Sequence, residues 1–187
     1  MSLSLILLIV AGLFVIWIIA VYNGLITLRN RVKEAWSDID VQLKRRHDLI
    51  PNLLESVKGY LKHEKELLEN ITASRSAAMD AQRSGDTLGL AKAEGQLGQL
   101  LGGLRIAVEA YPDLKANTNI AQLMDELSDT ENKIMAARRF YNGQVRDFNT
   151  KLQVFPTNII GSMLTFTAFT FFEIEDPKER ENVTVKF

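Results

Sequence analysis

The sequence predicts an all-α protein: a single N-terminal transmembrane helix, an antiparallel three- to four-helix bundle and a short C-terminal tail that could contain β-strands. Three observations support this prediction. Residues 3–28 contain no charged side chain. From residue 32 onward, apolar residues recur at intervals of three and four, the spacing of an amphipathic helix. Only four prolines occur in 187 residues, three of them at or after residue 112, which indicates long regular elements.

The first element is the apolar stretch LSLILLIVAGLFVIWIIAVY, residues 3–22. About 20 residues rising 1.5 Å each cross the roughly 30 Å hydrocarbon layer of a membrane. Tyr22 is well placed for the interface, where an amphipathic ring is favoured. A cleaved signal peptide is the competing interpretation, but only two residues precede the stretch and no A-x-A cleavage site follows it. We therefore expect a retained anchor over residues 1–28.

The basic residues that follow the anchor predict its orientation. Arg29, Arg31 and Lys33 lie directly after it, and nothing basic precedes it except the terminal amine. The positive-inside rule then predicts a single-pass protein of the inner (cytoplasmic) membrane, with its N-terminus outside and its C-terminal domain in the cytoplasm. The same three side chains are candidate contacts to anionic membrane lipid, at about 1 kcal/mol each. Setting the topology alone is the alternative role.

The bundle is expected over residues 29–153. An apolar stripe runs from Val32 to Ile71, with Pro51 inside it. Because an internal proline removes one helical hydrogen bond, the helix either kinks there or ends near Ile50 while another begins. Residues 29–50 are thus a stalk or first helix, followed by a helix over 51–83. Ser84-Gly85-Asp86 should stop that helix and cap the next.

Two further helices complete the bundle. The first, over residues 86–111, is rich in glycine, which indicates either close helix approach or a mobile helix. The second, over residues 119–153, has apolar residues stepping by four and three without a slip, a period typical of knobs-into-holes packing in coiled coils. Thr118 or Asn119 is expected to cap its start.

A search for chemistry finds no catalytic, cofactor-binding or metal site. The chain has no cysteine, which excludes disulfides, thiolate metal sites and a cysteine nucleophile. His47 and His63, 16 residues apart, would point about 160° apart on one straight helix. The carboxylates of residues 125–131 are explained by the helix dipole. Lys44-Arg45-Arg46 is expected to be a solvated face or a supply of interhelical ion pairs.

Net charge excludes one class of partner. With 22 basic and 23 acidic residues, the chain has a formal charge of -1 and no general attraction to nucleic acid. We therefore expect membrane lipid and protein as partners, and no nucleic acid.

The tail, residues 154–187, is unusually apolar. No charge occurs from Leu152 to Phe172, and so many apolar side chains are rarely left in water. The tail could fold over the bundle, rest on the membrane or bind another subunit. Residues 171–174 and 183–187 resemble short strands, which would gain most by pairing with other copies. The expected oligomer contacts are Phe166, Phe169, Phe171, Phe172, Val183 and Val185.

Long stretches of the chain resemble one family. The segments YNGLITLRNRVKEAWSDIDVQLKRRHDLIPNLLESVKGYLKHEKE and AYPDLKANTNIAQLMDELSDTENKIMAARRFYNGQVRDFNTKLQVFPTNII closely resemble the LemA family of bacterial membrane-anchored proteins, as does the ending FFEIEDPKERENVTVKF. The resemblance implies an antiparallel helical bundle on an N-out anchor and no established activity. Some family members are encoded beside membrane proteases, which is a hint of partnership.

These features together favour a membrane-anchored helical scaffold that self-assembles into a homo-oligomer and has no catalytic activity. The alternative is an adaptor that binds a membrane protein partner such as a protease. An enzyme or transporter is disfavoured, because an enzyme needs convergent polar groups in a pocket and a span without ionisable residues offers no transport route.

Overall fold

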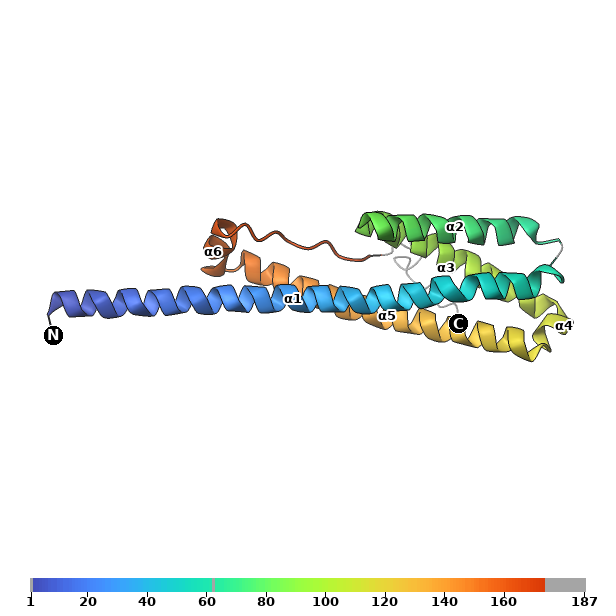
Figure 1. The fold of residues 1–187 in the computed structure, drawn as a ribbon, viewed down its shortest axis with the longest axis horizontal. Helices are drawn as coiled ribbons and strands as arrows, with labels where there is room; N and C mark the ends of the chain where they lie inside the picture. The colour runs from blue at the N-terminus through green and yellow to red at the C-terminus, as the bar shows by residue number, and fades with distance from the viewer. Residues whose placement is uncertain (1, 62, 174–187) are drawn as a thin grey trace, which may run out of the picture. The chain divides into compact units, whose positions relative to one another are not determined.

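The computed structural model describes residues 2–61 and 63–173 and confirms the predicted all-α fold, with no strand in that part of the chain. Its helices, drawn in Figure 1, are α1 (Leu3–Lys58), α2 (Lys65–Ser84), α3 (Thr87–Ala110), α4 (Pro112–Lys115), α5 (Thr118–Gln153) and α6 (Thr157–Met163).

The described residues form two compact units. Unit 1 comprises residues 2–40 and 136–171, and unit 2 comprises residues 41–61, 63–135 and 172–173. Helices α1 and α5 supply residues to both units, whereas α2, α3 and α4 belong to unit 2 and α6 belongs to unit 1.

Helix α1 is continuous from Leu3 through Pro51 to Lys58, so the chain neither ends a helix near Ile50 nor folds back at the proline. Its N-terminal part is long and apolar enough to cross a membrane, and only 6% of the most apolar 18-residue window is buried. Residues 41–58 of the same helix belong to unit 2. The sequence left two roles open for residues 29–50: a stalk that continues the anchor, or a member of the bundle. In the structure one helix, α1, contains both the anchor and a bundle segment.

The helix expected over residues 51–83 is interrupted. Helix α1 ends at Lys58, and Gly59 and Tyr60 form a turn before α2 begins at Lys65. The carbonyl of Val57 accepts hydrogen bonds from the amides of Tyr60 and Leu61, both at 3.0 Å. Leu61 is buried in the turn at a position that also fits the helical stripe, which is why the apolar spacing alone does not reveal the break.

The caps of the next helices follow local chemistry. As expected, α2 ends at Gly85, whose left-handed φ of 72° suits glycine, and the Asp86 side chain caps α3 by accepting from the Gly89 amide at 2.9 Å. The cap of α5 differs from the expected Thr118 or Asn119. Asn117 Oδ1 accepts from the amides of Asn119 and Ile120, at 3.0 and 3.3 Å.

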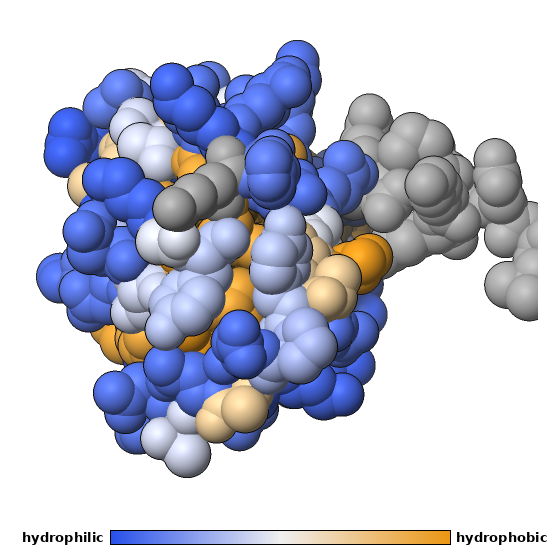
Figure 2. All heavy atoms as spheres, turned by 90° about the vertical axis from the view of Figure 1, so that its right-hand side faces the viewer, coloured by the Kyte–Doolittle hydropathy of each residue, from blue (hydrophilic) through white to orange (hydrophobic). Residues whose placement is uncertain are grey.

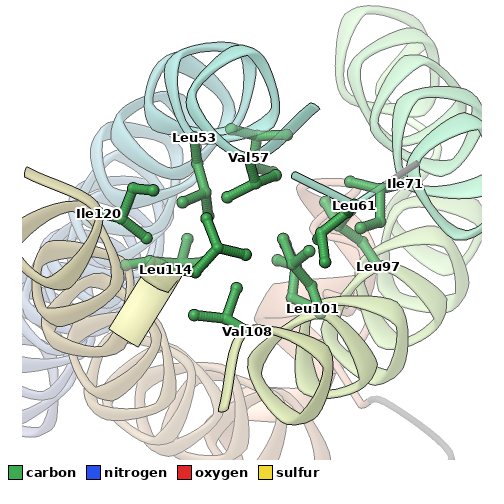
Figure 3. Close-up of a cluster of buried hydrophobic side chains, with 12 residues drawn as sticks. Leu53, Val57, Leu61, Ile71, Leu97, Leu101, Val108, Leu114 and Ile120 are labelled. Atoms are coloured by element: carbon green, nitrogen blue, oxygen red, sulfur yellow. The ribbon is translucent and has the colours of Figure 1, made fainter. Parts of the chain in front are cut away.

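Unit 2 has an up-down-up-down arrangement of the C-terminal part of α1, α2, α3 and the N-terminal part of α5, as Figure 1 shows. Figure 3 shows aliphatic side chains from these elements meeting in one cluster. Figure 2 shows that hydrophilic side chains cover most of one face of the molecule, with apolar ones visible between them. The buried cluster consists of Ile50, Leu53, Val57, Leu61, Ile71, Leu97, Leu101, Leu104, Val108, Leu114, Ile120 and Leu127.

Unit 1 combines the N-terminal part of α1 with the C-terminal part of α5, helix α6 and the extended segment after it. The rings of Trp36 and Tyr141 pack edge to face with centroids 5.2 Å apart. At Gly161 in α6, an added Cβ would lie 2.9 Å from Leu152 Cδ2 of α5. The glycine therefore permits α6 to approach α5 closely.

The tail contains no strand in its described part. Residues 171–173 of the first expected strand are irregular, and the second expected strand, residues 183–187, lies outside the described residues. Residues 157–163, which the sequence analysis left without a helix, form α6 instead.

The core cluster gives a first prediction. Leu104→Ala should lower the free energy of unfolding by about 2–5 kcal/mol, because Leu104 is fully buried and its loss leaves a cavity. Ile106→Ala on the same helix should change it by no more than about 0.5 kcal/mol, since Ile106 is 70% exposed. Denaturant unfolding of the full chain in mild detergent measures both; equal effects would contradict the observed core.

Candidate functional site

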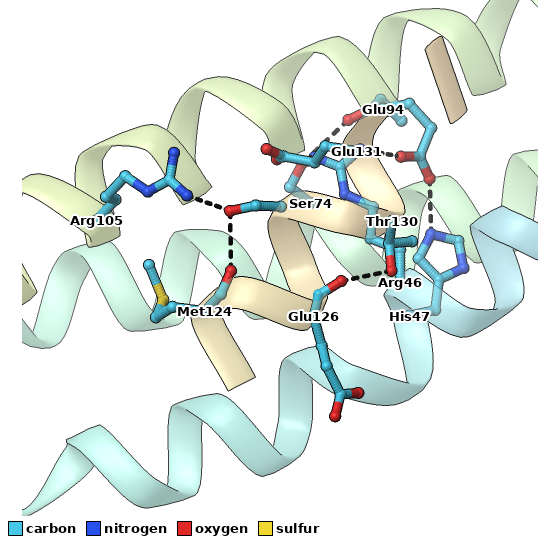
Figure 4. A network of polar contacts seen from close by, with 11 residues as sticks. Arg46, His47, Ser74, Glu94, Arg105, Met124, Glu126, Thr130 and Glu131 are labelled. Carbon is cyan, nitrogen blue, oxygen red and sulfur yellow. Dashed lines mark hydrogen bonds and ion pairs between the residues drawn. The ribbon is translucent and has the colours of Figure 1, made fainter. Parts of the chain in front are cut away.

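A network of buried charges lies inside unit 2. Arg46 Nη1 donates to Glu94 Oε2 at 2.9 Å, and His47 Nε2 lies 2.6 Å from Glu94 Oε1. Arg46 Nη2 also donates to Glu131 Oε1 at 3.1 Å. Figure 4 shows these side chains meeting from three helices: Arg46 and His47 from α1, Glu94 from α3 and Glu131 from α5. Arg46, His47 and Glu94 are at most 4% exposed.

The fourth helix of unit 2, α2, uses a side chain to contact the backbone of the same turn of α1. Pro51 has no N–H, so the carbonyl of His47, four residues earlier, lacks its usual helical donor. Arg75 of α2 fills that place, because its Nε donates to the His47 carbonyl oxygen at 2.8 Å. The arginine thereby satisfies an acceptor that an internal proline would otherwise leave unpaired.

Gly98 of α3 lies beside the buried guanidinium of Arg46. An added Cβ at Gly98 of α3 would lie 3.4 Å from Arg46 Nη2, at the near limit of ordinary van der Waals contact. Since a Cβ would fit at this distance, close approach does not by itself require a glycine at position 98.

A second layer of charge surrounds the network. Arg45 lies 3.4 Å from Asp129 Oδ2 and 3.9 Å from Glu126 Oε2, and Lys133 donates to Asp129 at 2.7 Å. The hydrogen bond from Lys133 lowers the pKa of Asp129 below its ordinary value, and the charge of Arg45 acts in the same direction. Since these groups are largely exposed, each pair contributes little to stability.

Chemically, this arrangement holds helices in register rather than presenting reactive groups to solvent. The polar side-chain atoms of Arg46, His47 and Glu94 are directed at one another and are covered by protein. Within the described residues, no three His, Asp or Glu side chains form a group that could hold a metal ion. His63 is exposed.

The sequence analysis found part of this network. It expected Lys44-Arg45-Arg46 to form a solvated face or to supply interhelical ion pairs, and Arg45 and Arg46 do supply them, whereas Lys44 is exposed and pairs with Asp48 of its own helix. It missed Glu94. The signal was present, because Glu94 falls between Leu90 and Leu97 on the buried stripe of α3. A charge at such a position indicates a buried partner.

The tail is held to unit 1 by an aromatic and polar clamp. The ring of Phe148 in α5 packs against Phe166 and Phe169, with centroids 6.3 and 5.2 Å away. Asn149 exchanges two hydrogen bonds with the backbone of Phe169, at 2.9 and 3.0 Å. The Tyr141 hydroxyl donates to the Thr170 carbonyl at 3.0 Å, and burial raises the pKa of Tyr141.

Several residues that were expected to contact another subunit lie in or next to this clamp. Phe166 and Phe169 are half-buried against their own chain, Phe171 is exposed and Phe172 is fully buried. Val183 and Val185 lie outside the described residues. Of the alternatives for the tail, folding over its own helices is observed for residues 166–170. Contact with a second subunit stays a prediction.

The expected lipid contacts differ among themselves. Arg31 and Lys33 are exposed, whereas Arg29 is half-buried. The Arg29 guanidinium lies over the Phe166 ring, 5.7 Å from its centroid, in a cation–π contact within unit 1. Lipid contact by these residues likewise stays a prediction.

Comparison with known proteins identifies the family. The model of the LemA family matches residues 35–187. The chain belongs to the LemA family. It is 30% identical over 165 residues to Protein LemA of Metamycoplasma hominis, covering 88% of this chain and 74% of that relative.

This LemA-family chain is also similar, at lower sequence identity, to two magnetosome proteins. Magnetosome protein MamQ 2 of Paramagnetospirillum magneticum is 22% identical over 183 residues, covering 86% of this chain and 67% of the relative. Magnetosome protein MamQ of Magnetospirillum gryphiswaldense is 21% identical over 182 residues, with 85% and 67% covered.

The buried network predicts a large effect of one neutralised charge. Glu94→Gln should lower the free energy of unfolding by about 3 kcal/mol, because removing one partner of a buried pair leaves the other charge uncompensated. Glu109→Gln, an exposed site on the same helix, is the matched control and should change little. Denaturant unfolding compares the two; a Glu94→Gln effect no larger than that of the control would refute the role of the pair.

The proline and the arginine should be coupled. Arg75→Met should cost roughly 1–2 kcal/mol by leaving the His47 carbonyl unpaired. In a Pro51→Ala background the cost should shrink, because the alanine N–H can bond to that carbonyl. A double-mutant cycle measured by unfolding tests the coupling, with Arg83→Met on the same helix as an exposed control. Strict additivity would contradict the compensation.

Proposed function

We propose that this LemA-family chain is a membrane-anchored helical scaffold that self-assembles into a homo-oligomer at the inner (cytoplasmic) membrane of a bacterium. Its N-terminus lies outside, and units 1 and 2 beyond the span lie in the cytoplasm. The protein has no catalytic activity of its own and works by holding copies of itself, and whatever they bind, at the membrane surface.

One observation carries the proposal. The N-terminal part of α1 is an apolar rod that the chain leaves uncovered, and the C-terminal part of the same helix supplies Arg46 and His47 to the buried network. Only 6% of the apolar window of α1 is buried, while Arg46 and His47 of α1 join α3 and α5 in unit 2. An apolar rod left uncovered by its own chain needs lipid around it. A helix that is tied into the bundle then keeps the bundle at the membrane.

Several further observations support a scaffold. The buried ionisable groups of unit 2 are at most 4% exposed and offer no surface to a substrate. Phe140 and Phe171 are exposed aromatic side chains, the type enriched in protein interfaces. Similarity to Protein LemA and to proteins named for the magnetosome supports membrane association.

The test is the mass of the assembly in mild detergent. The full chain should elute as a homomeric particle of several copies, and a variant ending at residue 173 should form a smaller particle. This truncation leaves the clamp of Phe166 and Phe169 intact, whereas removing residues 161–187 would also expose Phe148. Multi-angle light scattering gives the protein mass.

Two point variants sharpen this test. Phe171→Ser should reduce assembly, whereas Ala168→Ser, an exposed site on the same segment, should not. Unchanged mass in the truncated chain would sink self-assembly through the tail. A monomer that copurifies with a different membrane protein in fixed ratio would favour the adaptor function instead.

A further inference from the structure

Unit 1 contains a pocket of about 350 Å³ next to the uncharged part of α1. Tyr22, Ile26 and Arg29 of α1 line one side, and Phe148 of α5 lines another. The segment after α6 closes the remainder with Leu164 to Thr167 and Phe169. All of these residues belong to the same unit, so the pocket is formed within one compact body.

Arg29 gives the pocket a positive charge, and the part of the chain that the structure describes supplies no carboxylate paired with it. It is the first charged residue after the uncharged stretch 3–28. No ion pair recorded among the described residues includes Arg29, and its buried Nε has no hydrogen-bond partner there. Its guanidinium is held over the Phe166 ring at 5.7 Å. A positioned, unpaired guanidinium is suited to binding a phosphate group through two parallel hydrogen bonds.

The position of the pocket along α1 matches the level of lipid headgroups. Residues 3–22 rise about 30 Å, the thickness of the hydrocarbon layer. Arg29 lies seven residues beyond Tyr22, or about 10 Å further along the helix. Tyr22 therefore falls at the edge of the hydrocarbon layer, and the long Arg29 side chain, which tilts toward the helix N-terminus, can reach back into the headgroup region. The hydroxyls of Thr165 and Thr167, in the pocket wall, add hydrogen-bonding capacity for an anion.

Helix α6 presents an exposed apolar face beside the same pocket. Ile159 and Met163, four residues apart on α6, are 51% and 77% exposed, and Phe155, just before the helix, is 79% exposed. Figure 1 shows α6 alongside the N-terminal half of α1, and Leu164 and Phe166, directly after α6, line the pocket with Tyr22. The face thus continues the apolar surface of the span, and acyl chains are the occupant that such continuity favours.

From this geometry we infer that the pocket binds the headgroup phosphate of an anionic membrane lipid. Arg29 holds the phosphate, while the apolar face of α6 lies in the adjoining acyl layer. The inference rests on the proposed membrane anchoring, but not on self-assembly. It makes the extended tail a second membrane contact, in addition to the span.

The lipid site is tested by counting bound lipid. The full chain is reconstituted with mixed phosphatidylglycerol and phosphatidylcholine, and native mass spectrometry reports the lipid retained per protomer. Arg29→Gln should reduce phosphatidylglycerol retention about fivefold, the effect expected from one basic residue at an anionic surface. Lys58→Gln, an exposed basic residue at the C-terminal end of α1, should leave it unchanged. Equal losses in both variants, or none in Arg29→Gln, would overturn the site.

A soluble anion is the competing ligand. Glycerol phosphate is added to the protein in phosphatidylcholine alone and its retention is measured in the same way. Retention that depends on Arg29 as strongly as that of phosphatidylglycerol would assign the pocket to a soluble phosphate and overturn the lipid.

The apolar face of α6 is tested separately by single cysteines, since the natural chain has none. In liposomes, a membrane-impermeant maleimide should label Lys58→Cys readily but should label Ile9→Cys, Ile159→Cys and Met163→Cys at least tenfold more slowly. Asn158→Cys, a polar position of α6, should react faster than Met163→Cys. Rapid reaction at Met163→Cys with Ile9→Cys protected overturns only this inference, whereas rapid reaction at Ile9→Cys overturns the anchoring.

Discussion

Two consecutive residues of α1, Arg46 and His47, hold together the helices of unit 2. Their side chains bind Glu94 of α3 and Glu131 of α5, and the His47 carbonyl accepts from Arg75 of α2. A buried ion pair adds little net stability compared with apolar residues of the same shape, but a misaligned partner would leave charge uncompensated in the core. The network therefore acts chiefly on register: sliding any of these helices by one turn separates a donor from its acceptor.

The same turn explains how α1 can pass through Pro51. A proline inside a helix usually causes a kink or a break because a carbonyl loses its donor and meets the ring. Here the pyrrolidine is exposed, and Arg75 replaces the lost donor at 2.8 Å. The His47 carbonyl, which loses its helical donor because of the proline, thus accepts a hydrogen bond that links α1 to α2. Continuity of α1 then lets one helix include both the apolar rod and the buried charges of unit 2.

Apolar spacing predicted the helices at 86–111 and 119–153 almost to their observed ends, because Gly85-Asp86 and Phe155-Pro156 mark those ends in the local sequence. It did not predict the turn at Gly59, where Leu61 continues the stripe while buried in a turn. Nor could it pair Arg46 with Glu94, since a charged residue on an apolar stripe does not reveal which charge on another helix it meets. Long-range contacts of this kind depend on how helices are arranged, which periodicity does not encode.

The clamp on the tail shows why an apolar segment without a strand partner can be ordered. An extended chain leaves backbone groups unpaired, and near a membrane an open edge is costly. Asn149 replaces a neighbouring strand by exchanging two hydrogen bonds with the backbone of Phe169. The Tyr141 hydroxyl donates a hydrogen bond to the carbonyl of Thr170. Side chains of α5 thus satisfy a segment whose aromatic rings are packed on Phe148. Three backbone groups of the segment, the N–H and C=O of Phe169 and the C=O of Thr170, are thus paired inside unit 1, while Phe171 stays exposed.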